Sequence, residues 1–181
     1  MRRIVYDVAL TLDNFLCSED GGVEDFLASG PGVDAYFARL QTYDTVLMGR
    51  RTYEFGYAHG LEPGQRAYPH MEHYLFSDTL SFDGDQVHVV EKARALDVID
   101  ELKGRPGSDI YLCGGGAFAG FLLDHGRVDR LVVKLNPILL GSGIRAFGES
   151  RRRVAMRLID SEAYGDGLHL LRYDLDYGEG S

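Results

Sequence analysis

The chain has 181 residues and a mass of 20.1 kDa, with 45% hydrophobic and 26% charged residues, which suits one folded domain and excludes disordered, collagen-like and membrane-embedded compositions. A formal net charge of −9 and a pI near 5.1 argue against a broad surface for nucleic acid or an anionic membrane, because both need dense positive charge. Any bound anion must therefore be held locally.

Short apolar runs alternate with helical patterns along the chain. Runs rich in Val, Leu, Ile and Tyr predict mostly buried strands at 4–10, 45–49, 73–77, 87–90, 110–113 and 130–136. Apolar residues at helical spacing predict a helix over 33–42, a second over 95–102 that ends before Gly104, and a third from the glycines at 114–116 to about Gly126.

This alternation predicts an α/β domain with a mostly parallel sheet and helices on both faces. After residue 150 the pattern changes, and the strand-like runs 153–163 and 167–177 flank turn residues at 164–167. We expect them to form a C-terminal antiparallel hairpin. One domain over 1–177 and a loose tail at 178–181 complete the expected organisation.

Other features bear on location and mobility. The only cysteines, Cys17 and Cys113, have no Cys-x-x-Cys spacing, so a disulfide framework is not expected. Asp7 interrupts the first apolar run before it could act as a signal peptide, and no run approaches the ~20 residues of a membrane helix. We expect a cytoplasmic chain with no membrane or nucleic-acid partner. Whether the long loop at 56–71 acts as a lid stays open.

The stretch IYLCGGGAFAGFLLD places Gly114, Gly115 and Gly116 where a strand gives way to a helix. The first turn of a helix presents free N–H groups and a partial positive charge, and a residue without Cβ lets a phosphate approach the backbone. A packing turn is the competing explanation, but a simple turn rarely needs three glycines. The stretch favours phosphate binding, although it lacks the spacing of the Rossmann and P-loop motifs.

The stretch VLMGRRTYE repeats this arrangement, since a strand ends at Gly49 and a helix opens with Arg50, Arg51 and Thr52. Two guanidinium groups there oppose the helix dipole, which favours negative charge at that end. Arginine binds phosphate with two donors, and the threonine hydroxyl offers another. Solvated arginines on an acidic protein are the alternative.

Taken together, these two stretches resemble the dihydrofolate reductase superfamily, whose strand-Gly-Arg-x-Thr and Gly-Gly-Gly turns bind the phosphates of NADPH. ALTLDNFL (9–16) resembles the first strand of that family and the loop over the nicotinamide. VDRLVVKLNPILLGSGIRAF (128–147) resembles the reductase domain of the bifunctional riboflavin-biosynthesis deaminase-reductases and its stand-alone relatives. The resemblance covers about residues 2–177 and implies a dihydrofolate-reductase-like three-layer α/β/α fold.

The resemblance also implies a cofactor site. Arg50 would meet the 2′-phosphate, which favours NADPH over NADH, and a cis peptide would join Gly114 to Gly115. Phe76 and Ser77 would lie beside the adenine and its ribose. The residues implied to contact NADPH are Ala9, Leu10, Leu16, Gly49, Arg50, Arg51, Thr52, Phe76, Ser77, Gly114, Gly115, Gly116, Ala117 and Phe118.

The resemblance departs from the folate reductases at one place. Their acidic residue on the helix after the first loop matches Val33 here, and the neighbouring Asp34 is turned about 100° around the helix. Asn136-Pro137 and the segment 140–143 resemble the riboflavin-pathway reductases, which act on a phosphoribosyl substrate. We therefore predict an NADPH-dependent oxidoreductase nearest to 5-amino-6-(5-phosphoribosylamino)uracil reductase, with a homodimer implied by the family.

Alternatives stay open: a reductase of a pterin or another small carbonyl or imine substrate, an NADPH-binding module without turnover, and a structural protein whose glycines are only turns. Candidates for delivering a proton or fixing the substrate are Asp13, Asp34 and Tyr36, for which turn, cap and core roles are the simpler explanations. Because close positioning supplies much of the rate, a dedicated acid is not obligatory. No metal is expected: His70 and His73 lack a third placed ligand and read as surface or loop histidines.

Overall fold

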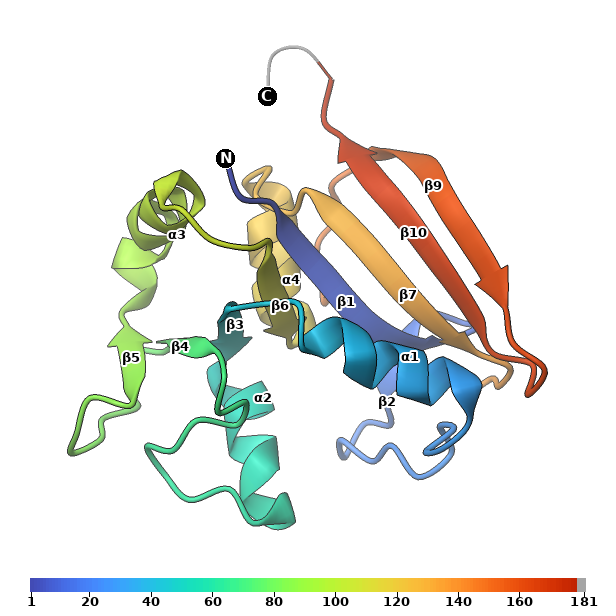
Figure 1. Ribbon diagram of the computed structural model, residues 1–181, viewed down its shortest axis with the longest axis horizontal. Helices are drawn as coiled ribbons and strands as arrows, with labels where there is room; N and C mark the ends of the chain where they lie inside the picture. The colour runs from blue at the N-terminus through green and yellow to red at the C-terminus, as the bar shows by residue number, and fades with distance from the viewer. Residues whose placement is uncertain (179–181) are drawn as a thin grey trace.

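Eight strands form one central sheet in the order β5-β4-β3-β6-β1-β7-β10-β9, in a computed structural model that describes residues 1–178 (Figure 1). The first six strands in that order are parallel, and β10 and β9 join them as an antiparallel C-terminal hairpin. The strands are β1 (Ile4–Thr11), β3 (Thr45–Gly49), β4 (Glu72–Phe76), β5 (Val87–Val90), β6 (Ile110–Gly114), β7 (Arg130–Asn136), β9 (Ala155–Ala163) and β10 (His169–Asp176).

Helices cover both faces of this sheet. The helices are α1 (Pro31–Leu40), α2 (Arg50–Phe55), α3 (Ala95–Gly104) and α4 (Gly116–Asp124), with 3₁₀ turns η1 (Gly56–His59) and η2 (Lys92–Arg94). One core cluster packs α3 and α4 against the sheet, and a second lies on the face of α1 and α2. Figure 1 shows α1 crossing β1 and β7 on one face, with α4 behind the sheet. The predicted α/β/α layering is confirmed.

The apolar runs of the central strands follow from burial on both faces. Successive side chains of β1 alternate, so that Tyr6 and Leu10 enter the cluster of α3 and α4 whereas Val5 enters that of α1 and α2. Ala9 therefore faces α1 while its neighbour Leu10 points away from it. Of the residues expected to flank the nicotinamide, Leu10 packs in the cluster of α3 and α4.

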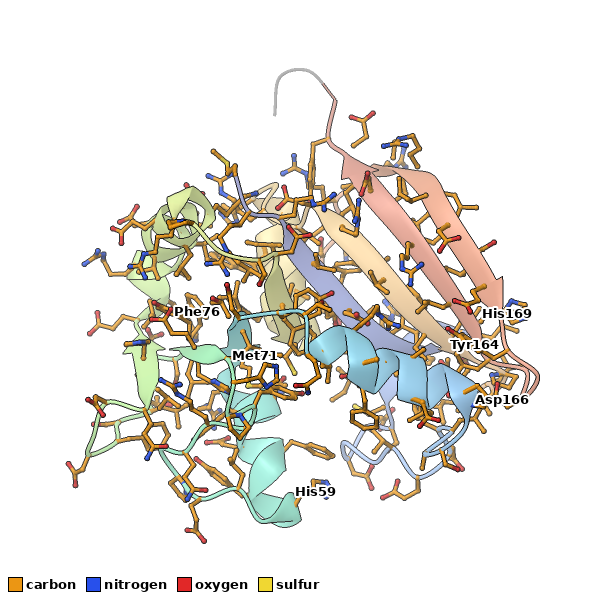
Figure 2. All side chains as sticks on the ribbon, viewed as in Figure 1. His59, Met71, Phe76, Tyr164, Asp166 and His169 are labelled. Carbon is orange, nitrogen blue, oxygen red and sulfur yellow. The ribbon has the colours of Figure 1, made fainter. Side chains whose placement is uncertain are left out.

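Helix α1 is held at its start by the hairpin turn. Pro31 occupies its first position, where a missing N–H is tolerated, and it follows Gly30 at φ 116°. Asp166 and Tyr164 of the turn between β9 and β10 lie beside this end of the helix (Figure 2). The hairpin therefore fixes how α1 crosses the sheet.

A second, two-stranded sheet was not predicted. β2 (Phe15–Cys17) pairs antiparallel with β8 (Ile144–Arg145), and both strands are too short to show a period in the sequence. The predicted tail falls mainly on residues 179–181, which lie outside the described residues. Within residues 1–178, no helix is long and apolar enough to cross a membrane.

Candidate functional site

The two strand–helix junctions that open α2 and α4 lie next to each other at one edge of the sheet. β3 pairs with β6 so that Met48 lies beside Gly114. A Cβ added to Gly49 would lie 3.3 Å from the Phe118 Cβ and 3.7 Å from the Gly114 carbonyl oxygen. The structure therefore brings together the two turns that the sequence singled out.

Each of the three glycines in the second junction has its own steric setting. Gly114 has φ 118° and a cis peptide bond to Gly115, as the family resemblance implied. A Cβ on Gly116 would lie 2.1 Å from the Arg145 carbonyl oxygen, whereas one on Gly115 would meet only the Thr52 hydroxyl oxygen, at 2.9 Å. Close packing thus explains why residue 116 is a glycine. At Gly115 the backbone has only the Thr52 hydroxyl nearby, so a ligand could approach it.

The first turn of α4 offers unpaired backbone donors beside that opening. The first bond of the helix runs from the Ala119 N–H to the Gly115 carbonyl, so the N–H groups of residues 116–118 have no helical acceptor. These donors and the partial positive charge of the helix end suit phosphate oxygens. The residues present at this junction fit a pyrophosphate.

The arginines of the first junction lie near the surface. Arg50 forms an ion pair with Glu54 one turn later, with 2.9 Å between Nη1 and Oε2. Arg51 is exposed and has no hydrogen bond or ion pair with any other part of the described chain. The Arg51 guanidinium is thus free to bind an anion, whereas the Arg50 guanidinium would first have to leave Glu54.

An aromatic pair lies beside the junctions. The ring of Phe76, at the end of β4 (Figure 2), stacks on that of Phe118 with 4.6 Å between centroids. The neighbouring Ser77 hydroxyl oxygen accepts hydrogen bonds from the N–H groups of Thr79 and Leu80, each 3.1 Å long. Ser77 therefore shapes the turn after β4 next to the predicted adenine position.

The loop after β1 is anchored to the segment after β7. Asp13 accepts hydrogen bonds from the Thr11 hydroxyl and from the N–H groups of Leu140 and Gly141. The Thr11 hydroxyl, together with these N–H groups, keeps the pKa of Asp13 below its usual value. Asp13 is thus held as a carboxylate that closes this loop. Leu16, three residues later, packs against the α3 and α4 cluster.

A groove of about 830 Å³ runs along the outer side of α4. Its walls come from Phe15 of β2, from Ala117 and Phe121 of α4, and from the chain at 141–150. Ala117, in the first turn of α4, is the predicted cofactor residue that lines it. The groove therefore opens beside the donors of that turn.

The structure separates the other two candidate acid–base residues. Asp34 is exposed on α1, while Val33, at the position of the acid in folate reductases, is buried. Tyr36 points toward the sheet, and its hydroxyl lies 3.0 Å from that of Tyr111. Burial raises the pKa of Tyr36 well above its ordinary value, so its hydroxyl stays protonated.

Ionisable residues that were not predicted lie beneath α1. Asp7 of β1 is 1% exposed and binds Arg39 of α1 through both oxygens, at 2.9 and 3.0 Å. The Tyr43 hydroxyl donates a third hydrogen bond to it. Lys134 of β7 is buried near this pair, with its ammonium 5.0 Å from the centre of the Tyr36 ring. The sequence did carry a signal for these residues: Asp7 and Lys134 are charged residues within apolar runs that predict strands buried on both faces.

The two histidines have unlike settings. His70 is exposed, but His73 is fully buried in β4, so the expectation of a surface or loop residue is wrong for His73. Its Nδ1 lies 3.0 Å from the Met71 carbonyl oxygen, and its Nε2 accepts the Tyr68 N–H at 3.1 Å. Both ring nitrogens are used within the fold.

A family model described as the RibD C-terminal domain matches residues 2–170. The uncharacterized protein YwjB of Bacillus subtilis is 32% identical over 175 residues, which cover 93% of this chain and 96% of YwjB.

Solved structures share the fold at lower identity. A putative riboflavin biosynthesis protein from Shewanella superposes with a TM-score of 0.79 at 23% identity, covering 97% of this chain and 99% of that one. A deaminase/5-amino-6-(5-phosphoribosylamino)uracil reductase from Thermotoga maritima gives 0.71 at 15%, covering 96% and 56%. Dihydrofolate reductase from Enterococcus faecalis gives 0.63 at 16%, covering 96% of each chain. The fold is dihydrofolate-reductase-like.

Proposed function

Because the chain belongs to the RibD C-terminal domain family, we propose that it is an NADPH-dependent reductase with its cofactor across the junctions at 49–52 and 114–118. The observation that carries this proposal is the convergence of the two glycine turns, with Gly49 packed against Phe118 and Gly115 against Thr52. A strand–helix junction of either kind alone would be a common packing feature.

Each part of the site has a task toward that cofactor. The N–H groups of 116–118 and the Thr52 hydroxyl would bind the pyrophosphate, and Arg50 with Arg51 the 2′-phosphate. Phe76 and Ser77 would border the adenosine, and Ala9 with Leu16 the nicotinamide. When bound, NADPH supplies a hydride. The protein positions the acceptor and keeps water away from it.

For the substrate, we propose a pyrimidine related to 5-amino-6-(5-phosphoribosylamino)uracil. The Thermotoga protein of the same fold carries that reductase activity in its name. Buried Val33 supports the choice, because it offers no carboxylate to a pterin. A reductase of another small carbonyl or imine compound is the alternative.

A two-step experiment tests this proposal. Calorimetry with NADPH and with NADH should show tighter binding of NADPH. Loss of NADPH absorbance should then follow addition of 5-amino-6-(5-phosphoribosylamino)uracil but not of dihydrofolate. If NADPH binds but neither compound oxidises it, the substrate assignment is wrong. If calorimetry shows no heat with either cofactor, the proposal of a reductase is wrong.

We also propose a homodimer, for which edge strand β9 supplies a surface. β9 is exposed along its whole length and carries Met156, Leu158 and Ile159, and an open apolar edge favours pairing with another strand. Light scattering tests this proposal: a monomer at all concentrations would contradict it, and Leu158→Lys should weaken a dimer formed through this edge.

A further inference from the structure

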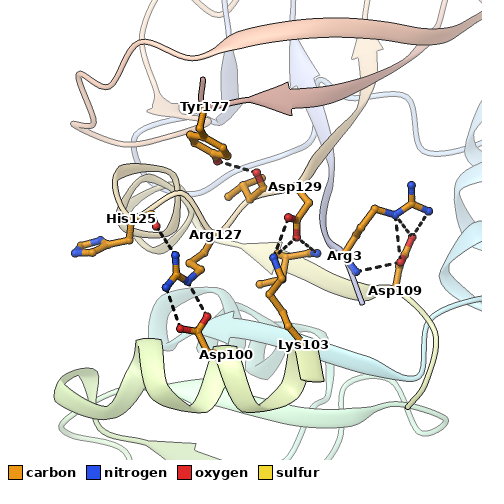
Figure 3. Close-up of polar contacts among 10 residues, drawn as sticks. Arg3, Asp100, Lys103, Asp109, His125, Arg127, Asp129 and Tyr177 are labelled. Atoms are coloured by element: carbon orange, nitrogen blue, oxygen red, sulfur yellow. Dashed lines mark hydrogen bonds and ion pairs between the residues drawn. The ribbon is translucent and has the colours of Figure 1, made fainter. Parts of the chain in front are cut away.

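The chain has three lysines, Lys92, Lys103 and Lys134, and they differ in how their charge is balanced. Lys92 is exposed near Asp78, at 3.4 Å. Lys103 is 9% exposed, and its ammonium donates to both oxygens of Asp129, at 2.7 and 2.8 Å (Figure 3). Lys134 is 7% exposed, yet within residues 1–178 its ammonium has no hydrogen bond or ion pair.

The surroundings of Lys134 explain why its charge has no ion-pair partner. The charge of Asp7 acts on that of Lys134, but both Asp7 oxygens are bound by Arg39, and Asp7 also accepts a hydrogen bond from the Tyr43 hydroxyl. Within residues 1–178, the close partner of the ammonium is the face of the Tyr36 ring. An unpaired buried charge costs free energy, so a chain that keeps one commonly uses it.

Lys134 also lies beside the position proposed for the nicotinamide. It pairs across the strands with Ala9, the residue expected beside the nicotinamide, and neighbouring strands are about 4.8 Å apart. On the other side of β1, Cys113 is the last residue before Gly114. The amine therefore lies at the same sheet edge as the cofactor junctions, on the face covered by α1.

A chain of tyrosines runs from the Tyr36 ring beside this position. The Tyr36 and Tyr111 hydroxyls are in contact, and the Tyr68 ring meets that of Tyr111 edge-on, with 5.8 Å between centroids. The Tyr68 hydroxyl lies 3.9 Å from the Cys113 sulfur. Flat aromatic walls with few acceptors suit a planar ring compound.

We propose that Lys134 binds the oxygen or nitrogen of the reducible C=O or C=N group of a planar ring substrate and gives that atom its proton. This inference rests on the proposed reductase function and assigns the acid that Asp13, Asp34 and Tyr36 were considered for. Asp13 is held as a carboxylate, Asp34 is exposed, and Tyr36 presents the face of its ring, not its hydroxyl, to the Lys134 ammonium.

The step balances as follows. A hydride from the reduced nicotinamide adds to carbon, and the π electron pair of the double bond moves to the heteroatom. That atom forms a bond to hydrogen as one N–H bond of the Lys134 ammonium breaks. The neutral amine left behind regains a proton from water. Burial lowers the pKa of Lys134, with Asp7 opposing and Arg39 adding to that effect, which makes the ammonium a better acid near neutral pH.

The kinetic test compares Lys134→Arg and Lys134→Met with Lys103→Met, using the substrate found to oxidise NADPH. In the wild type, kcat should fall at alkaline pH as Lys134 loses its proton. Lys134→Arg keeps a positive charge but is a far weaker acid, so kcat should fall about 100-fold or more with a small change in KM. The alkaline decrease in kcat should be absent from this variant. Lys134→Met should lose kcat and also raise KM. Lys103→Met should keep the wild-type pH profile.

A spectroscopic test is independent of turnover. In protein labelled with ε-¹³C-lysine, three lysine signals are expected and are assigned with the variants. The Lys134 signal should titrate below the ordinary pKa of a lysine side chain. In protein saturated with NADP⁺, it alone should shift when 5,6-diaminouracil, dihydrofolate or cyclohexenone is added.

The outcomes separate this inference from the proposed function. If the wild-type protein does not bind NADPH in calorimetry, the proposed reductase function is contradicted. A wild-type protein that binds NADPH, together with a Lys134 signal that responds to none of the three probes, defeats the role of Lys134. An active Lys134→Met variant with kcat within threefold of wild type and the same pH profile also defeats it.

Discussion

The two strand–helix junctions at 49–52 and 114–118 and the group of side chains around Lys134 (called the Lys134 cluster below) are built in different ways. The junctions present backbone N–H groups and glycines, whereas the Lys134 cluster consists of ionisable and aromatic side chains from β1, α1, β6 and β7. A cofactor shared by many enzymes needs only a fixed backbone, while a particular substrate needs particular side chains. Changes to the first should alter folding and cofactor binding, and changes to the second should alter catalysis.

The largest effect is expected at Gly116. In Gly116→Ala, the new Cβ would lie 2.1 Å from a backbone oxygen that cannot move away cheaply. We expect a loss of about 3 kcal/mol in the free energy of unfolding, measured by urea denaturation. Gly115→Ala is the matched control: it meets only a hydroxyl, so it should lose about 1 kcal/mol at most and mainly weaken NADPH. Equal stability losses would contradict these separate roles.

Acid should destabilise the fold through His73, whose ring stacks on that of Tyr68. Burial lowers the pKa of His73 to about 4 from 6.5, so between these values the unfolded chain binds a proton that the folded chain does not. The contribution of neutral His73 to the free energy of unfolding is therefore fully present above about pH 6.5. It is lost as the pH falls toward 4, by roughly 2 to 3 kcal/mol. Denaturation curves between pH 4 and 7.5 measure this, and His73→Gln should flatten the dependence.

The two buried lysines should respond oppositely to removal of their charge. Lys103→Met breaks two charge-assisted hydrogen bonds to Asp129, so we expect a loss of about 2 kcal/mol. Lys134→Met removes a buried charge with no ion-pair partner, so stability should stay the same or rise by up to about 1 kcal/mol. Thermal denaturation compares them, and a large loss at Lys134 would show a structural role instead.

The smallest predicted effect concerns cofactor choice at Arg50. This side chain is partly exposed and already paired with Glu54, so its contact with a 2′-phosphate should contribute about 1.5 kcal/mol. Arg50→Ala should therefore weaken NADPH about tenfold and leave NADH nearly unchanged, as measured by calorimetry. Equal losses for the two cofactors would refute the assignment, and Arg51→Ala shows whether the second arginine shares the task.

The two junctions could be recognised from the sequence, whereas the Lys134 cluster could not, for a physical reason. Residues 49–52 and 114–118 are contiguous, and their glycine and arginine content is unusual for a strand–helix turn, so each motif is visible by itself. The Lys134 cluster is assembled from single residues such as Asp7, Lys134 and Tyr111, which lie far apart in the chain. Strand pairing brings Lys134 beside Ala9, and no local pattern encodes that register.

The short sheet of β2 and β8 was missed for a related reason. Its strands depend on Gly143, where a Cβ would lie 2.3 Å from the Cys17 carbonyl oxygen, and not on any hydrophobic period. His73 was placed wrongly because a histidine in an apolar run gives no sign that backbone groups will satisfy both ring nitrogens. In both places, tertiary contacts decide the structure.

The crystal structure of the protein with NADPH tests the central claim most directly. The account predicts that the pyrophosphate lies against the N–H groups of residues 116–118, between Gly49 and Gly115, with the 2′-phosphate at Arg50 or Arg51 and the nicotinamide beside Ala9. A dinucleotide bound elsewhere, or phosphates that do not contact both junctions, would contradict it.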